Sequence, residues 1–147
     1  MFFDDPVAAL RNICCHLKPG GRVGLVTWQQ EDTMVWHPAH VVRKYMVPPE
    51  QGDADMMERV GSWGDPAFVT ETLTSAGFDD VGVKKCDLDV AVPAEADIPA
   101  SLLIGMVDAA QRDAALADWR RQRESLTRDG KLQLDLRMHL ITARRPN

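Results

Sequence analysis

The alternation of apolar and polar positions divides the first part of the chain into a helix and a strand. Apolar residues recur at helical spacing from Val7 to Leu17, after an aspartate (Asp4 or Asp5) and a proline that suit a helix start. The sequence Lys18-Pro19-Gly20-Gly21 ends that helix. Residues 22–28 are almost continuously apolar, which predicts a strand in a sheet covered on both faces.

The next segment predicts helices separated by loops. Residues 34–46 have a helical pattern, in which Pro38 indicates a first-turn position, a kink or a late start. Residues 50–55 are acidic and loop-like, and residues 56–60 fit a short helical turn. Asp65-Pro66 repeats the cap-then-proline start, and Gly77 ends the helix that follows.

Residues 78–92 predict a strand with a defect. Val81 and Val83 occupy odd positions, whereas the larger apolar residues that follow occupy even ones: Cys86, Leu88, Val90 and Val92. A pattern of period two changes phase only through a bend or an extra residue. We therefore expect a bulge near Lys84 and Lys85.

The last third of the chain predicts two helices and a strand. Apolar residues mark helices near residues 98–107 and 115–126, and Asp129-Gly130 predicts a turn. From Leu132 to Leu140 the leucines and one methionine alternate with polar residues, as in an antiparallel strand with one wetter face. The whole pattern predicts one α/β domain over residues 1–147, with a small three-stranded sheet flanked by helices.

Composition narrows the class of protein further. The 17 basic and 22 acidic residues give a net charge of −5, which argues against binding to nucleic acid or anionic lipid. Three cysteines, Cys14, Cys15 and Cys86, show no metal-ligand spacing and predict reduced thiols. No signal-peptide pattern or bilayer-length apolar run is present in the sequence. We expect a cytoplasmic protein that does not contact a membrane.

Three landmarks together resemble class I S-adenosylmethionine-dependent methyltransferases. Residues 2–28, with Leu17-Lys18-Pro19-Gly20-Gly21 before the strand, resemble that family's passage from its fourth to its fifth strand. Residues 65–81, with Ala76-Gly77-Phe78, resemble the helix and turn before the sixth strand, and residues 140–146 are similar to the final strand. The resemblance implies the C-terminal part of a Rossmann-like fold, a mixed sheet of strands five, seven and six.

The same resemblance shows what the sequence lacks. The family's cofactor half carries a G-x-G-x-G loop and an acidic ribose-binding residue, and no G-x-G occurs here. We therefore expect a truncated, non-catalytic methyltransferase-like domain that does not bind S-adenosylmethionine by itself. Two alternatives stay open: an active methyltransferase completed in trans by a separate N-terminal half, and a small-molecule binding module.

The family pocket would correspond to residues that follow its fourth and fifth strands. They are Phe2, Phe3, Asp4 and Trp28 for the cofactor, and Trp28, Gln29 and Trp36 for the substrate. The simpler interpretation, which we favour, is that the phenylalanines pack in the core, Asp4 caps the helix and Trp28 packs under the next helix. We favour it because a binding cleft is formed only when both of its walls are present.

Other candidate residues favour structural roles. His37 and His40 could share a helix face, but the sequence supplies no evident third ligand, so no metal site is expected. Nor does the sequence indicate any catalytic residue. The arginines between residues 120 and 128 alternate with acidic residues, which is typical of a solvated helix face.

The missing neighbour of the strand at residues 22–28 predicts self-association. Its outer edge would expose unpaired backbone groups along an apolar sequence that only Arg22 guards. We expect a homodimer or higher oligomer, formed through this edge or, alternatively, through the helix at residues 6–17.

Overall fold

The computed structural model describes residues 3–30, 34–48, 51–95 and 105–147. The chain forms two compact units. The first contains Met1–Gln30, Gly52–Cys86 and Arg137–Asn147, and the second contains Glu31–Gln51 and Asp87–Leu136.

The strands form one sheet in the order β1-β4-β2. They are β1 (Arg22–Trp28), β2 (Asp79–Pro93) and β4 (Lys131–Arg144), and the two-residue strand β3 (Thr127–Arg128) also pairs with β4. β1 and β4 run antiparallel, with Leu25 opposite Ile141. The prediction of an antiparallel last strand is therefore confirmed, and β3 makes the sheet four-stranded rather than three-stranded.

Three helices belong to the first unit: α1 (Pro6–His16), α3 (Gln51–Ser62) and α4 (Pro66–Ser75). Asp5, rather than Asp4, caps α1, because its Oδ1 accepts the N–H of Ala8 at 2.8 Å. Asp65 caps α4 through the N–H of Ala67 at 2.9 Å, as predicted. α3 begins at Gln51, so the expectation of a loop is wrong for residues 51–55, and residue 50 lies outside the described residues. The short helical turn expected at residues 56–60 is part of this longer helix, since a single turn is unstable by itself.

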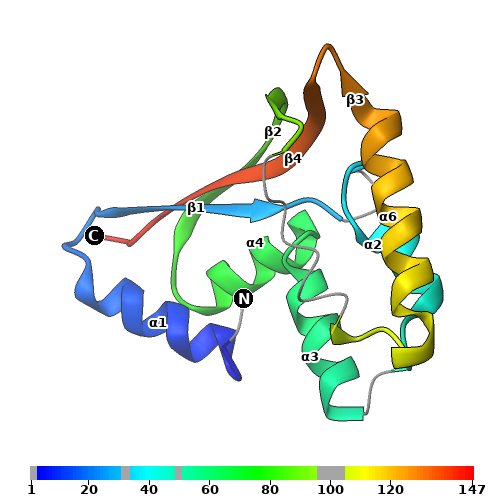
Figure 1. Cartoon of the computed structure of the whole chain (residues 1–147). Coiled ribbons are helices and arrows are strands. Elements are labelled where there is room, and N and C mark those ends of the chain that lie inside the picture. The colour runs from blue at the N-terminus through cyan, green and yellow to red at the C-terminus, as the bar shows by residue number, and fades with distance from the viewer. Residues whose placement is uncertain (1–2, 31–33, 49–50, 96–104) are drawn as a thin grey trace. The chain divides into compact units, whose positions relative to one another are not determined.

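The core of the first unit lies between these helices and one face of the sheet. α1 and α4 lie on the same side of β1 (Figure 1). Val23 and Leu25 of β1 point into this core with Ile141 and Ala143 of β4. The helices and the turns beside them contribute the other buried residues: Leu10, Cys14, Trp63, Val69, Leu73, Ala76 and Phe78.

The opposite face of β1 and β4 is exposed. Val26 is 64% exposed, Trp28 44% and Leu140 43%. The expectation that this strand is covered on both faces is therefore wrong for the described residues. The phase expected for the last strand also fails at its end, because Val26 pairs with Leu140 and the odd residue His139 is buried instead.

Strand β2 changes phase where the sequence predicted. Val81 and Val83 are partly buried, and Lys84 and Lys85 are both exposed. The partly buried positions then continue at Cys86, Val90 and Val92, whereas Leu88 is exposed. Two adjacent exposed residues shift the inward positions from odd to even. The bulge that would produce this shift stays a prediction.

The second unit contains α2 (Ala39–Val42), the 3₁₀ turns η2 (Arg43–Tyr45) and η3 (Ala109–Gln111), and α6 (Arg112–Leu126). Pro38 is the N-cap of α2, so the late start is the correct alternative. Val107, expected in a helix, instead bridges to Met46, and residues 98–103 lie outside the described residues. Asp129 and Gly130 have φ values of 52° and 70°, as a tight hairpin turn requires.

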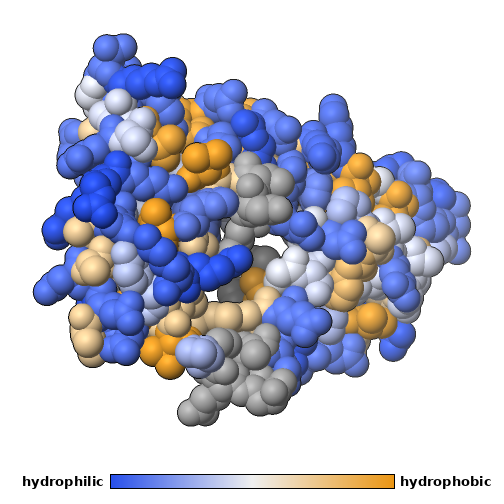
Figure 2. Space-filling view, turned by 90° about the vertical axis from the view of Figure 1, so that its right-hand side faces the viewer, coloured by the Kyte–Doolittle hydropathy of each residue, from blue (hydrophilic) through white to orange (hydrophobic). Residues whose placement is uncertain are grey.

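The surface of the described residues is mostly hydrophilic on the face in Figure 2, where apolar residues form small groups. No helix in the described ranges is long and apolar enough to span a bilayer.

Candidate functional site

The carboxyl end of β1 is where the family resemblance places a pocket, and three polar residues are buried there. Thr27, Gln29 and His139 have exposed fractions of 6%, 8% and 3%. Thr27 lies directly opposite His139 in the ladder between β1 and β4. The strand ends therefore bring a threonine, a glutamine and a histidine to one end of an otherwise apolar inner face.

Gln29 is held by the backbone of β4. Its main-chain N–H donates to the carbonyl of Arg137 at 2.9 Å, and its side-chain Nε2 donates to the carbonyl of Met138 at 3.1 Å. The residue therefore extends the β1–β4 ladder by one position. Its side-chain amide nitrogen therefore has a structural role at the end of the β1–β4 ladder.

The turn between α3 and α4 closes on this end of the strand. A Cβ atom on Gly64 would lie 3.1 Å from the nitrogen of Gln30 and 3.2 Å from the carbonyl carbon of Gln29. Glycine is thus required by the close approach of two backbone segments. Trp63, 5% exposed, packs edge-on against Phe68 at 5.8 Å and 78° and fills the adjacent core.

The structure describes most of the residues predicted to line a pocket, and those that it describes at the start of the chain are exposed. Phe3 is 48% exposed and Asp4 is exposed, whereas Phe2 lies outside the described residues. Trp28, expected to pack under a helix, has its side chain on the exposed face of the sheet, because it alternates with the buried Thr27. Trp36 belongs to the second unit, where its Nε1 donates to the carbonyl of Asp135 at 3.0 Å.

The ring nitrogens of His16 and His37 each contact a backbone group close by in the sequence. His16 Nδ1 lies 2.8 Å from the carbonyl of Asn12 in its own helix, and His37 Nδ1 lies 3.3 Å from the main-chain nitrogen of Ala39. Among the described residues, no three His, Cys, Asp or Glu side chains are arranged to hold a metal ion.

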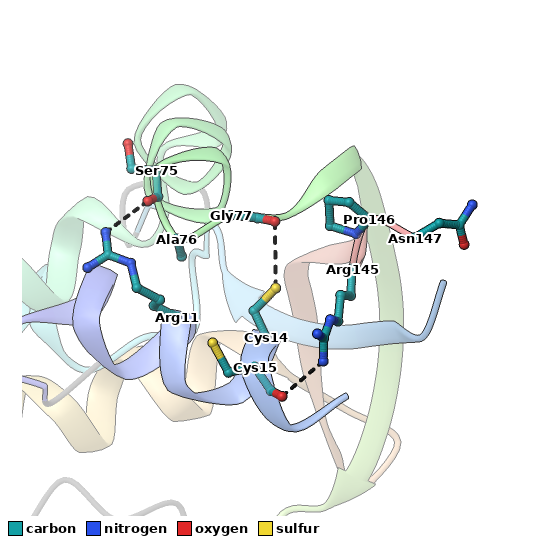
Figure 3. Close-up of a pocket in the computed structure, with 9 residues that line it drawn as sticks. All are labelled: Arg11, Cys14, Cys15, Ser75, Ala76, Gly77, Arg145, Pro146 and Asn147. Atoms are coloured by element: carbon teal, nitrogen blue, oxygen red, sulfur yellow. Dashed lines mark hydrogen bonds between the residues drawn. The ribbon is translucent and has the colours of Figure 1, made fainter. Parts of the chain in front are cut away.

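A pocket of about 400 Å³ lies at the other end of β1 (Figure 3). The chain end beside it pairs with the residues that precede β1, since the N–H of Gly20 donates to the carbonyl of Arg145. Cys14 lies in this pocket, and its Sγ donates to the carbonyl of Gly77 at 3.6 Å. The other lining residues are Arg11, Cys15, Ser75, Ala76, Gly77, Arg145, Pro146 and Asn147.

The two guanidinium groups of this pocket serve helix ends. Arg11 donates to the carbonyl of Ser75 at 3.2 Å, in the last turn of α4. Arg145 donates to the carbonyls of Cys15, at 2.9 Å, and Leu17 at the end of α1. Positive charge at the carboxyl end of a helix offsets its dipole. No local sequence signal marks either arginine for this role.

A second cluster, which was not predicted from the sequence, is centred on Asp118 of α6. The hydroxyl of Tyr45 donates to its Oδ2 at 2.6 Å, and Lys44 Nζ lies 2.6 Å from the same oxygen. Arg121 pairs with the other carboxylate oxygen. The hydrogen bonds from Lys44 and Tyr45 hold the pKa of the Asp118 carboxyl below its ordinary value, and the same contact raises the pKa of Lys44. This cluster fixes η2 to α6.

Solved structures similar to this chain include three that align with nearly its full length. They are two structures of Haemonchus contortus phosphoethanolamine N-methyltransferase 2, one with phosphomonomethylethanolamine and S-adenosylhomocysteine and one with S-adenosyl-L-methionine, and a candidate methyltransferase of Bacillus halodurans. Sequence identities are 12%, 13% and 15%, and TM-scores are 0.42, 0.40 and 0.45. Each match covers 99% of this chain.

The chain spans only part of those proteins: 31% of each nematode chain and 60% of the bacterial one. At such low identities and TM-scores, these similarities establish neither a family nor an activity. No family model matches the sequence, and no curated protein matches it.

Proposed function

We propose that this chain is the part of a S-adenosylmethionine-dependent methyltransferase-like fold that holds strands five, seven and six, and that it does not transfer methyl groups by itself. The observation that carries this proposal is the strand order β1-β4-β2. In the fold that the sequence resembles, the last strand enters between the fifth and sixth strands and runs antiparallel to the fifth. β4 has this position and this direction relative to β1.

The residues at the ends of β1 support the proposal that the chain does not transfer methyl groups by itself. A methyltransferase binds its cofactor largely through a glycine-rich loop and an acidic residue on the ribose, and this sequence has no G-x-G. Gly20 and Gly21 stand in a turn instead, where Gly20 adopts a φ of 72°. At the other end of β1, Gln29 uses its amide on Met138, and the indole of Trp28 faces outward.

Isothermal titration calorimetry tests this proposal directly. We expect no saturable heat when S-adenosylmethionine or S-adenosylhomocysteine is titrated at micromolar concentrations. A micromolar dissociation constant would correspond to a binding free energy of about −8 kcal/mol. A stoichiometric micromolar site would contradict the proposal. If such a site were found and the Trp28→Ala variant bound the cofactor as tightly as the wild type, the site would lie away from β1.

Completion in trans is the second candidate, because the outer edge of β1 is unpaired among the described residues. In the resembling fold this edge pairs with the fourth strand. Mixing this chain with a separately produced G-x-G-containing half would then yield cofactor binding that neither part has by itself. Absence of any complex in a pull-down of the two halves would argue against this alternative.

A further inference from the structure

The outer edge of β1 presents a regular row of backbone groups. Gln29 donates its N–H to β4, and Gly21 accepts from Arg145 of the same segment at 2.7 Å, so the odd-numbered residues of this strand face β4. In an antiparallel ladder, alternate residues direct both N–H and C=O to opposite sides. The N–H and C=O groups of Arg22, Gly24, Val26 and Trp28 therefore point to the outer edge.

Within the described residues, this edge lacks the protection that edge strands usually carry. Charged side chains, prolines and bulges normally block pairing with another chain. Arg22 is the one charged residue of β1, but its guanidinium lies 2.9 Å from Asp80 of β2, so it is turned across the sheet and away from the edge. Next to the edge, Val26 and Trp28 are apolar and exposed.

The strand is also complementary to itself. Its outward-facing residues are spaced evenly about Leu25, so two antiparallel copies centred there place Gly24 opposite the partner's Val26 and Arg22 opposite the partner's Trp28. Each such pair exchanges two hydrogen bonds, about eight in total. No like charges meet in this register. A Cβ on Gly24 would have no neighbour within 4 Å, which leaves room for the valine beside it.

We propose that β1 pairs antiparallel with β1 of a second copy of this chain, across a twofold axis beside Leu25. The result is a continuous sheet through both subunits. An isologous contact of this kind closes after two copies, so the assembly is a dimer rather than a fibre. This inference rests on the edge geometry and is independent of the methyltransferase proposal.

Light scattering after size exclusion and amide hydrogen exchange test the proposal together. We expect a mass near twice 16.4 kDa. The amides of Gly24 and Val26 should be protected in the dimer and exchange faster on dilution, whereas those of Leu25 and Thr27 stay protected because they bond to β4. A monomer at high concentration, or a dimer with unprotected Gly24 and Val26 amides, would overturn the proposal.

Variants separate the strand edge from the other surfaces. Val26→Pro removes an outward N–H and no bond to β4, so it should give a folded monomer. Leu140→Lys changes the same exposed face on the neighbouring strand and should leave the dimer intact. Ile13→Glu, at a 37% exposed position of α1, should also leave it intact.

Two outcomes would assign the surface to another occupant. Loss of the dimer in Ile13→Glu but not in Val26→Pro would place the interface on α1 and refute strand pairing. Protection of Gly24 and Val26 only after addition of a G-x-G-containing half would assign the edge to that chain. The exchange measurement on the unmodified protein decides the question even if Val26→Pro does not fold.

Discussion

Thr27 lies directly opposite His139 in the ladder between β1 and β4, and both side chains are almost completely buried. The pair marks the position where the inner face of the sheet changes from aliphatic to polar, next to Gln29. Among the described residues, Thr27 Oγ1 has no hydrogen-bond partner. A buried polar atom without a partner costs free energy, so this position is a local weakness of the fold.

Thr27→Val should therefore stabilise the protein or leave its stability unchanged. Valine keeps the shape of threonine and removes the buried hydroxyl, whose desolvation costs about 1–3 kcal/mol when it has no partner. Urea unfolding monitored by circular dichroism measures the change. Thr142→Val on β4, whose side chain is exposed, is the matched control and should have little effect. A clear loss of stability in Thr27→Val would show that the hydroxyl has a partner, such as an ordered water or a ligand.

Gly64→Ala should destabilise the fold, whereas Gly61→Ala should not. At Gly64 the added Cβ would lie 3.1–3.3 Å from backbone atoms of Gln30, Gln29 and Gly61, and backbone atoms move little. We expect a loss of about 1–3 kcal/mol. A Cβ on Gly61, in α3, would meet nothing within 4 Å, and alanine favours the helix by up to about 1 kcal/mol. Thermal melts that rank the two variants in the opposite order would contradict the close approach.

Deletion of Lys84 should lower the stability of the protein strongly. The two exposed lysines keep Val83 and Cys86 both on the inward side of β2. With one residue removed, one half of the strand would turn its inward side chains to solvent. Lys84→Ser, which keeps the spacing, is the control and should melt near the wild-type temperature. If the deletion variant melted at the wild-type temperature, the phase change in β2 would not contribute to stability.

The elements with local signals were predictable from the sequence. The cap Asp65 and Pro66 fixes the start of α4, and the apolar run between Gly21 and Gln29 coincides with β1. The phase change at Lys84 and Lys85 was predictable because side chains alternate between the two faces of a strand, so a shift in the apolar pattern can be seen in the sequence. Such features depend on a residue and its near neighbours.

Features that depend on distant segments were not predictable. The run 22–28 does not reveal that one face of β1 is open, since an apolar strand looks the same whether or not a helix covers it. Likewise Leu140 was expected inside, but its register with Val26 places it on the exposed face. Lys44 and Asp118 lie far apart in the sequence, so their ion pair left no motif.

Asp118→Asn should reduce stability at neutral pH and flatten the dependence of stability on pH in acid. Because Lys44 and Tyr45 bond to the ionised carboxylate, the pKa of Asp118 is lower in the folded chain than in the unfolded one. The unfolded state therefore binds a proton first as the pH falls. The stabilisation is fully present above the ordinary carboxyl pKa, about 3.9, and is lost as the pH falls through the lowered folded value.

Urea unfolding at a series of pH values from neutral to about 2 measures this effect, since the window lies below the ordinary carboxyl pKa. The wild type should lose stability more steeply below about pH 4 than Asp118→Asn, because only the wild type carries this titrating carboxyl. Tyr45→Phe removes the 2.6 Å hydrogen bond and keeps Lys44, so its slope should lie between the other two. Identical acid slopes in the wild type and Asp118→Asn would mean that the cluster does not form in solution. Because Lys44 is exposed, its contribution to the pH dependence of stability should weaken as salt is added. The hydrogen bond from Tyr45 persists, so the slope of stability against pH that remains at high salt isolates the contribution of the hydroxyl.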